Sequence, residues 1–480
     1  MSFSFAFPHQ IATTFSRIFC HLLLISLVFN PIAALAQTPP PLPITPDGST
    51  NTQVTQTASG VDQINIAAPN AGGLSHNKFT DYNVNQSGQV INNFSGKVAS
   101  EIAAGTGPSA ITATQIAGFV TVNPNLQSSG SARVILNEVT SASDTQLLGY
   151  TEIAGTNADL ILANSNGITC RGCGFINTAR LTFIAGSSNF DASGNLGFNL
   201  KEQSNPSLSI PLITVEGLGL DVTKTSSAEI IASSIKILAN IYGADDTNLT
   251  IKSGEGRFDY QSKNITNSST SLALGSTPLF AIDAASLVKI QAGKIFIIAT
   301  REGVGVNMAS EVLASNEVKI DANGDVYYDN ISAENKVDVQ STKNISSIGS
   351  SSAISAPNLA LKAGGEFKNL GSVAAHNLDI LNSTTFTNLG TVEALALNLS
   401  NITNINNSGS LFGENSLTIS GANLTNNSGA LISAILESSQ INLSGDLQNY
   451  GELNSKKDLT IDAKNLRNFG NILATENGVS

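Results

Sequence analysis

The sequence predicts an all-β fold, a right-handed parallel β-helix with about 20 residues in each coil. Two observations predict it. Beyond residue 60, short apolar runs alternate with clusters of Gly, Asn and Ser, as strands alternate with turns. In the final third, an Asn-x-Gly pattern returns at nearly constant intervals, which is typical of stacked repeats.

Residues 1–36 have the pattern of a secretory signal peptide. Arg17 is their only Lys, Arg, Asp or Glu, and the run from Ile18 to Phe29 is almost wholly apolar. Small residues at Ala34 and Ala36 predict cleavage between Ala36 and Gln37. The apolar run is shorter than the roughly 20 residues that a membrane-spanning helix needs, so we expect export rather than anchoring.

Residues 37–59 are rich in Pro, Thr, Ser and Asn, which predicts a flexible or extended leader. The rest of the chain has ample apolar material for a core, since 41% of all residues are hydrophobic. A solenoid can accommodate this length without dividing, because each coil buries itself against its neighbours. The net charge of −12 argues against nucleic acid or an anionic membrane surface as a partner.

Two Asn-rich turns stand out in the middle of the chain. They are Asn123-Pro124-Asn125-Leu126 and Asn164-Ser165-Asn166-Gly167-Ile168, and each leads into a short apolar run. Asn tolerates left-handed backbone angles and hydrogen-bonds its own main chain, so both turns predict sharp corners between strands. Helical periodicity is scarce in this region, and Ser227–Leu238 is the one segment where a helix is a candidate.

In this order, the two turns resemble the paired motifs of the filamentous-haemagglutinin family, the large exoproteins of two-partner secretion. The resemblance covers Val61 to Asn307. It also includes Asn65–Asn70, Gly73–Asn77, Gly217–Asp221, Ala292–Ile295 and Gly303–Val306.

The resemblance implies that residues 60–307 are a secretion domain, recognised by the soluble periplasmic modules of a partner outer-membrane transporter. The residues it implies for recognition are Asn123, Pro124, Asn125, Leu126, Asn164, Asn166, Gly167 and Ile168. A role limited to shaping the coil is the alternative. Ser165 stands where the family has Pro, and losing that locked φ angle should loosen the second corner. We therefore expect export to depend more on Asn123 and Asn125 than on Asn166.

Cys170 and Cys173 are the only cysteines outside the predicted signal peptide. In an exported protein such a pair is expected to form a disulfide, here closing a very small loop. Free thiols are the alternative. A redox pair would need a helix start, and a metal site would need two further ligands, for which only His76 and His376 remain.

No catalytic, cofactor or metal site is predicted. His76 lies beside Ser75, but neighbouring side chains on a strand point to opposite faces, so we expect a turn or surface histidine. The segment Asp321–Asp325 lacks the glycine at position six and the glutamate at position twelve of a calcium loop. We therefore predict a plain turn there and a protein that is not an enzyme.

Residues 308–480 contain the repeats that predict a shaft of stacked coils. Their glycines are separated by 19, 19, 20, 22 and 19 residues, and alternating apolar positions flank each one. The Asn-x-Gly pairs are Asn369/Gly371, Asn388/Gly390, Asn407/Gly409, Asn427/Gly429, Asn449/Gly451 and Asn468/Gly470.

The predicted function is that of a secreted or surface-exposed adhesin of a Gram-negative bacterium. The alternative is the N-terminal part of a haemolysin or contact-dependent growth-inhibition toxin of the same pathway. A polysaccharide-cleaving β-helix enzyme comes third, because charged side chains are sparse. Expected partners are the transporter and a receptor on a host or neighbouring cell, without nucleic acid. Because the last repeat is followed by no capping segment, we also expect a longer exoprotein that has been cut short.

Overall fold

The computed structural model describes residues 41–96, 110–201, 212–266 and 280–480. Within these ranges it contains β-strands, one short 3-10 helix, η1 (Pro124–Leu126), and no α-helix. Thirty-five of the strands belong to one sheet, in which nearly all pairings are parallel. The sheet winds into about 15 turns that lie about 21 residues apart. The prediction of an all-β parallel β-helix is confirmed.

The candidate helix at Ser227–Leu238 is wrong. This segment forms strands β19 (Ser227–Ala232) and β20 (Ile235–Ile237). Both sides of β19 are buried, and a strand buried on both sides shows no alternation, so its apolar run resembles a helical pattern. The predicted signal peptide and its cleavage position lie outside the described residues. In the described part of the chain, no helix is long and apolar enough to cross a membrane.

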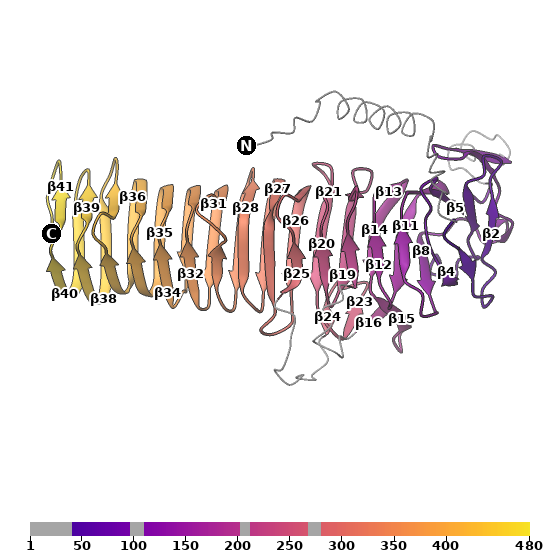
Figure 1. The fold of residues 1–480 in the computed structure, drawn as a ribbon, viewed down its shortest axis with the longest axis horizontal. Coiled ribbons are helices and arrows are strands. Elements are labelled where there is room, and N and C mark those ends of the chain that lie inside the picture. Colours follow the sequence, from indigo (N-terminus) through magenta and orange to yellow (C-terminus); the bar gives the residue numbers. More distant parts are fainter. Residues whose placement is uncertain (1–40, 97–109, 202–211, 267–279) are drawn as a thin grey trace, which may run out of the picture. The chain divides into compact units, whose positions relative to one another are not determined.

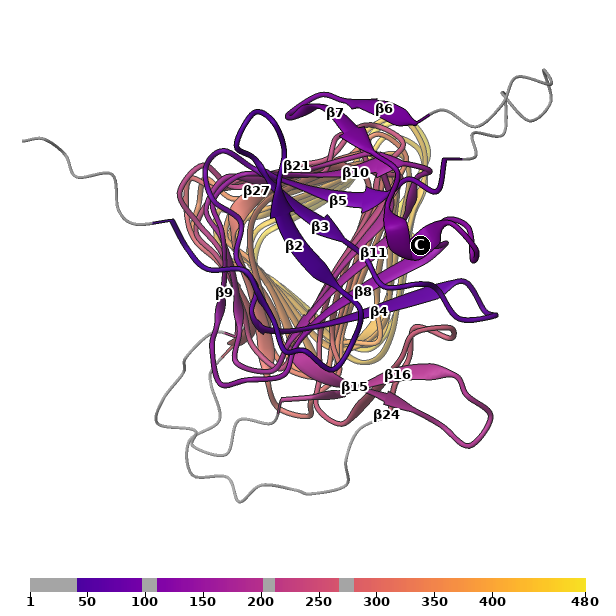
Figure 2. The same cartoon turned by 90° about the vertical axis from the view of Figure 1, so that its right-hand side faces the viewer.

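The wound sheet has three faces, here called C, A and B in chain order; each coil runs along all three, and the coils follow one another along the axis (Figures 1 and 2). Face C contains β9 (Thr145–Leu147), β12 (Ile168–Cys170), β17 (Ile213–Val215), β20, β25 (Phe280–Ala284), the starts of β27 (Gly305–Ala322) and β28 (Val326–Ala333), then β30 (Ile345–Ser347), β32 (Glu366–Asn369), β34 (Thr385–Asn388), and the ends of β35 (Thr391–Asn407), β36 (Ser410–Asn426), β38 (Ser439–Asn449) and β40 (Leu459–Asn468).

Faces A and B are built in the same way. Face A contains β3 (Asp62–Asn65), β5 (Gln89–Asn93), β10 (Tyr150–Gly155), β13 (Cys173–Ile176), β18 (Leu220–Asp221), β21 (Ile241–Tyr242), β37 (Leu431–Ala434), β39 (Glu452–Ser455), β41 (Asn471–Ala474), the starts of β26 (Lys289–Ala299), β31 (Ala353–Ala363), β33 (Ser372–Leu381), β35 and β36, the middle of β27 and the end of β28. Face B contains β4 (Leu74–Asp81), β8 (Val134–Val139), β11 (Ala158–Asn164), β14 (Thr178–Ile184), β19, β22 (Asn248–Ser253), β29 (Lys336–Ser341), the later parts of β26, β27, β31 and β33, the middle of β35 and β36, and the starts of β38 and β40. Longer strands such as β27, β35 and β36 bend through more than one face.

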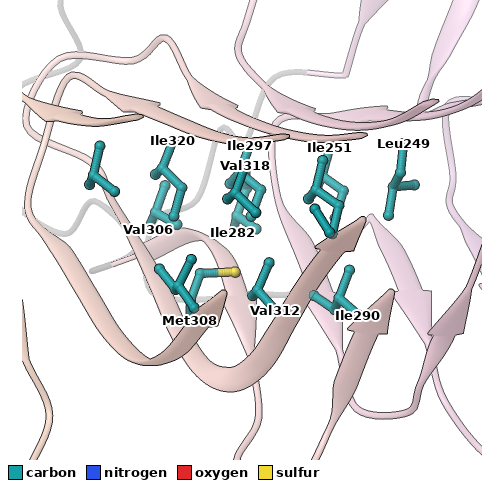
Figure 3. Close-up of a cluster of buried hydrophobic side chains, with 14 of the residues drawn as sticks. Leu249, Ile251, Ile282, Ile290, Ile297, Val306, Met308, Val312, Val318 and Ile320 are labelled. Carbon is teal, nitrogen blue, oxygen red and sulfur yellow. The ribbon is translucent and has the colours of Figure 1, made fainter. Parts of the chain in front are cut away.

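The core is a set of columns in which each inward side chain stacks on its counterpart in the next coil. On face B, Leu249, Ile295 and Val318 occupy one register position in three successive coils. Figure 3 shows such side chains filling the interior between the faces. Burying one Ile or Leu contributes about 1.5–3 kcal/mol, and every coil adds several. The array is therefore stabilised coil by coil.

Antiparallel strands close the N-terminal end of the helix. β2 (Gln53–Gln56) pairs with β3, and β1 (Thr45–Pro46) pairs with the end of β4. Figure 2 shows β2 lying across the first coil. Residues 37–59, predicted as a flexible or extended leader, thus contain β1 and β2 and are anchored to the first coils from Leu42 onward. The polar composition of this segment did not reveal the partner strands, which follow later in the chain.

Two further elements cover the outside of the first coils (Figure 2). An antiparallel sheet of β15 (Gly186–Phe190), β16 (Leu196–Leu200), β23 (Arg257–Asp259) and β24 (Ile265–Thr266) packs on face B. It buries Phe198 and Phe258 against outward residues such as Leu136 and Ile161. The hairpin of β6 (Ile111–Thr114) and β7 (Gly118–Thr121) packs on face A, where Ala117 and Val120 contact Val90 and Ala154.

In the repeats, the Asn-x-Gly pattern lies where face C turns into face A. The glycine is needed there for space, because a Cβ on Gly390 would lie 2.0 Å from the carbonyl oxygen of Gly371 in the preceding coil. One of the predicted Asn-x-Gly pairs, Asn427/Gly429, does not lie at the repeated position. Asn426, and not Asn427, occupies the repeated inward position, since extra residues form a turn in which Gly429 has a φ of 80°.

Candidate functional site

The first Asn-rich motif is a buried clamp at the corner between faces A and B. Asn123 is fully buried and is the N-cap of η1. Its Oδ1 accepts a hydrogen bond from the backbone N of Asn125 at 3.0 Å. Its Nδ2 donates to the carbonyls of Ile66 and Asn92 at 3.0 and 2.9 Å. The motif therefore ties the end of β5 to the segment that follows β3 in the preceding coil.

The rest of this motif reaches the N-terminal cap and the core. Asn125 Nδ2 donates to the carbonyl of Asn51, beside β2, at 2.8 Å and to that of Ile66 at 3.1 Å. Leu126 is fully buried in the main core. Pro124 occupies the first turn of η1, where its missing N–H is not needed. The four residues thus connect the cap to the first coils.

The second motif repeats this arrangement at the corner between faces B and C. Asn164 Oδ1 accepts from the backbone N of Asn166 at 2.8 Å, while its Nδ2 donates to the carbonyl of Ser143 at 3.0 Å. Asn166 Nδ2 donates to the carbonyl of Ser141 at 2.7 Å. Both asparagines thus hold the corner of the preceding coil. The two motifs lie at different corners of different coils.

Both motifs form corners between strands, as predicted, but their asparagines do not adopt left-handed backbone angles. Asn123 has a φ of −68°, and only Gly167 among these residues has a positive φ, of 123°. The asparagines are used for their side-chain amides, which satisfy main-chain groups of neighbouring segments. Ile168, also buried, continues into β12, and its N donates to the carbonyl of Leu212 in the next coil at 2.9 Å. Ser165 leaves the Asn164–Asn166 turn intact.

Cys170 and Cys173 form a disulfide across the corner between faces C and A. Both residues are 1% exposed and belong to the main core. Outside the corner, Arg171 forms an ion pair with Glu216 of the next coil. The N of Gly172 donates to the carbonyl of Gly219, also in the next coil, at 3.0 Å. The bridge therefore closes a corner that backbone bonds also hold.

His76 lies within strand β4 and not in a turn. Ser75 points inward and donates to the carbonyl of Ala67 at 2.7 Å, whereas His76 Nε2 lies 2.7 Å from Glu138 Oε2 on the outer side. Glu138 also accepts from the N and Oγ of Ser188 in β15, at 2.7 and 2.8 Å. Burial raises the pKa of Glu138, but the bonds from His76 and Ser188 outweigh it and lower the pKa. This carboxylate fastens the outer sheet to face B.

A second charged cluster beneath the outer sheet was missed by sequence reasoning. Glu229 on β19 is 7% exposed; it lies 3.3 Å from Lys263 Nζ and accepts from Thr182 Oγ1 at 3.0 Å. Lys263 Nζ also lies 3.6 Å from the centre of the Tyr260 ring. Burial and neighbouring Arg180 lower the pKa of Lys263 to about 8, although Glu229 opposes them. These residues are too far apart in the chain to form a local motif.

The segment Asp321–Asp325 contains the last two residues of β27 and the bend that leads to β28, where Asn323 Nδ2 donates to the carbonyl of Thr300 at 2.7 Å. Among the described residues, no group of three or more His, Cys, Asp or Glu side chains is arranged to hold a metal ion. The candidate site is therefore a set of corner clamps and outer attachments that shape and present the surface of the first coils.

The TPS secretion domain family model matches residues 43–328, more than half of the chain. This match extends beyond the predicted domain, residues 60–307, at both ends. The 16S rRNA endonuclease CdiA of Enterobacter cloacae subsp. cloacae is 34% identical over 313 residues, which cover 64% of this chain and 9% of that protein. The tRNA nuclease CdiA of Escherichia coli (strain NC101) is 36% identical over 268 residues, which cover 56% and 7%. The chain thus spans less than a tenth of the length of these relatives.

Among solved structures, the crystal structure of a filamentous hemagglutinin secretion domain is similar to this fold, with a TM-score of 0.51. The superposition covers 70% of this chain and 96% of the other, at 24% sequence identity. At this identity the likeness concerns the fold alone.

Proposed function

Since the chain belongs to the TPS secretion domain family, as its paired Asn motifs predicted, we propose that residues 43–328 act as its export module and that the following coils form an adhesive shaft. The protein is a two-partner secretion exoprotein, exported across the outer membrane to the surface or medium of a Gram-negative bacterium. The family implies interaction with a partner outer-membrane transporter. We also propose that the exported chain binds a receptor on a host or neighbouring cell and that it does not bind nucleic acid.

One observation carries the export mechanism. Every parallel pairing in the described residues joins a strand to the same face of an adjacent coil, as when β29 pairs with β27 before it and β31 after it. A coil can therefore fold as soon as its predecessor is in place, without waiting for distant parts of the chain. This coil-by-coil order of folding suits a chain that emerges from a pore progressively, starting at one end.

Folding outside the pore also supplies a driving force. Each new coil buries several apolar side chains, which contributes several kcal/mol and opposes backward sliding. The export module needs no chemistry of its own, and the proposal assigns it no enzymatic activity. The clamps at Asn123 and Asn164 then serve to start the stack correctly, because they join the cap and the first coils.

To test the proposal, the full chain is expressed with and without its partner outer-membrane transporter, and the protein released into the medium is measured. Transporter-dependent release of a protease-resistant chain is expected. Release at the same level without any transporter would contradict the export proposal. A variant that keeps the signal peptide but lacks residues 43–328 is the matched control and should stay in the periplasm.

A second candidate is the export portion of a contact-dependent growth-inhibition toxin. It is favoured by the identity of 34–36% to CdiA proteins whose names describe RNA nucleases. The matched residues cover only 7–9% of those proteins, so the nuclease activity is proposed only for a downstream part of a longer gene product. Reading the downstream DNA separates the two candidates: an encoded nuclease domain with an adjacent immunity gene would favour the toxin.

A further inference from the structure

A groove of about 600 Å³ runs along the corner between faces A and B in the repeat region. Its lining begins at Ala333 and ends at Ile435, beyond the region matched to the secretion domain. Small residues form the floor, because Ala333, Ala356 and Ala375 occupy the same register position in successive coils and Ala394 follows them. Leu395, Phe412 and Ile435 form apolar walls.

The rim of the groove is acidic. Glu393 and Glu414, from successive coils, are the charged lining residues, and neither carboxylate pairs with a cation among the described residues. The sequence from 344 to 455 has only two lysines, Lys362 and Lys368, and no arginine. Lys362 lies on face B and Lys368 on face C, so neither faces the groove, whereas His376 is part of its lining. The groove therefore combines an apolar floor with an acidic rim that contains no lysine or arginine.

The dimensions favour an extended chain as occupant. The lining residues come from six successive coils, and strands about 4.8 Å apart give a length of roughly 24 Å, which matches about seven extended residues. The apolar side chains on one face of an extended segment can lie on the alanine floor, while those on its other face point to the rim.

We infer that this groove binds an extended peptide segment of a partner protein in which apolar side chains alternate with lysine or arginine. The apolar side chains occupy the floor between Ala356 and Ala394, and the cations lie against Glu393 and Glu414. The inference goes beyond the export function, since it places a recognition site in the coils that follow the secretion domain.

The test measures fluorescence anisotropy of labelled heptapeptides added to the full chain. Three peptides are compared: the first alternates Lys with Leu, the second Glu with Leu, and the third Lys with Ser. We expect saturable binding of the Lys/Leu peptide alone. Absence of saturable Lys/Leu binding would overturn the inference. Equal binding of the Glu/Leu peptide would overturn the role of the acidic rim, and equal binding of the Lys/Ser peptide would overturn the role of the apolar floor.

Variants locate the binding. Ala374 points outward beside the floor, so Ala374→Trp should fill the groove and weaken Lys/Leu binding by about tenfold or more. Ser355→Trp, one coil earlier on the same outward position, is the second variant if the first misfolds. Ala360→Trp on the outside of face B is the matched control and should bind as the unmodified chain does. Undiminished binding by a folded, groove-filled variant would place the peptide elsewhere.

The acidic rim has its own control. The double change Glu393→Gln and Glu414→Gln should weaken binding several-fold, whereas Asp246→Asn with Glu302→Gln, both in coils that do not line the groove, alters the net charge equally. Equal weakening by both pairs would mean that binding follows net charge and not the groove. Circular dichroism of each variant shows that the coils are retained.

Discussion

The side-chain amide of Asn369 donates a hydrogen bond to Oδ1 of Asn388, one coil later, at 2.8 Å, and both side chains are fully buried. The same bond joins each later pair in the series, which continues through Asn407, Asn426, Asn449 and Asn468. An amide carries both a donor and an acceptor, so one residue type can repeat in every coil. The ladder satisfies a polar column inside an apolar core.

Breaking the ladder should destabilise the repeats. Asn407→Ala leaves Oδ1 of Asn426 buried without its donor, which should lower the free energy of unfolding by about 2–3 kcal/mol. Urea unfolding followed by circular dichroism measures the change. Asn406→Ala, on the neighbouring outward position, should change stability by less than about 0.5 kcal/mol. Equal effects of the two substitutions would show that the ladder contributes nothing specific.

The corner glycines should resist substitution for lack of space. In Gly390→Ala the new methyl would lie 2.0 Å from the Gly371 carbonyl oxygen, so coils must separate at a cost on the order of 3 kcal/mol. Gly349→Ala, where a Cβ meets nothing within 4 Å, is the control and should be nearly neutral. Thermal unfolding of both variants checks this. A neutral Gly390→Ala would disprove the close approach.

The two Asn motifs should differ in importance. Asn123→Ala removes two donated bonds and the cap of η1 from a fully buried site, so we expect a loss of about 2–4 kcal/mol and retention of precursor in the periplasm. Asn166→Ala removes one bond to a carbonyl from a half-buried side chain and should retain most export. Quantitative blotting of medium and periplasm measures the ranking. Stronger retention of the Asn166 variant would reverse it.

Loss of the disulfide should have a modest effect. Because the bridge closes a loop of sequence separation 3, it restricts few unfolded conformations and should contribute about 2 kcal/mol. Cys170→Ala with Cys173→Ala should therefore fold and be released, with a lowered unfolding midpoint. Complete loss of the folded protein would indicate that the bridge is required for the first coils to form.

Acid pH should weaken the attachment of the outer sheet to face B. The pKa of Glu138 is lowered below its ordinary value of 4.5 in the folded chain. The ionised carboxylate therefore adds stability above that pH, and the contribution disappears as pH falls through the folded pKa. Glu138→Gln should cost about 2 kcal/mol at pH 7 and progressively less below pH 4.5. A penalty that is independent of pH would contradict this role.

Much of the coil could be predicted from the sequence because its signals are local and repeated. Leu447, Asn449 and Leu453 alternate in the chain, and all three prove to be buried. The family resemblance likewise rested on short motifs. The reading of Asn427 as the repeated asparagine failed, because an inserted turn shifts the register by one residue and composition cannot show which of two adjacent asparagines faces inward.

The sequence by itself determined the stacked parallel coil, its period and its polar corners, since these follow from alternation and spacing within about 20 residues. Only the tertiary structure decided that each coil has three faces, and which of these faces are covered on the outside and which remain open. Glu138 meets Ser188 and Glu229 meets Lys263 across separations of 50 and 34 residues. The groove between Ala333 and Ile435 arises from six coils together. Such sites depend on stacking, because side chains from separate coils become neighbours only when the coils lie side by side.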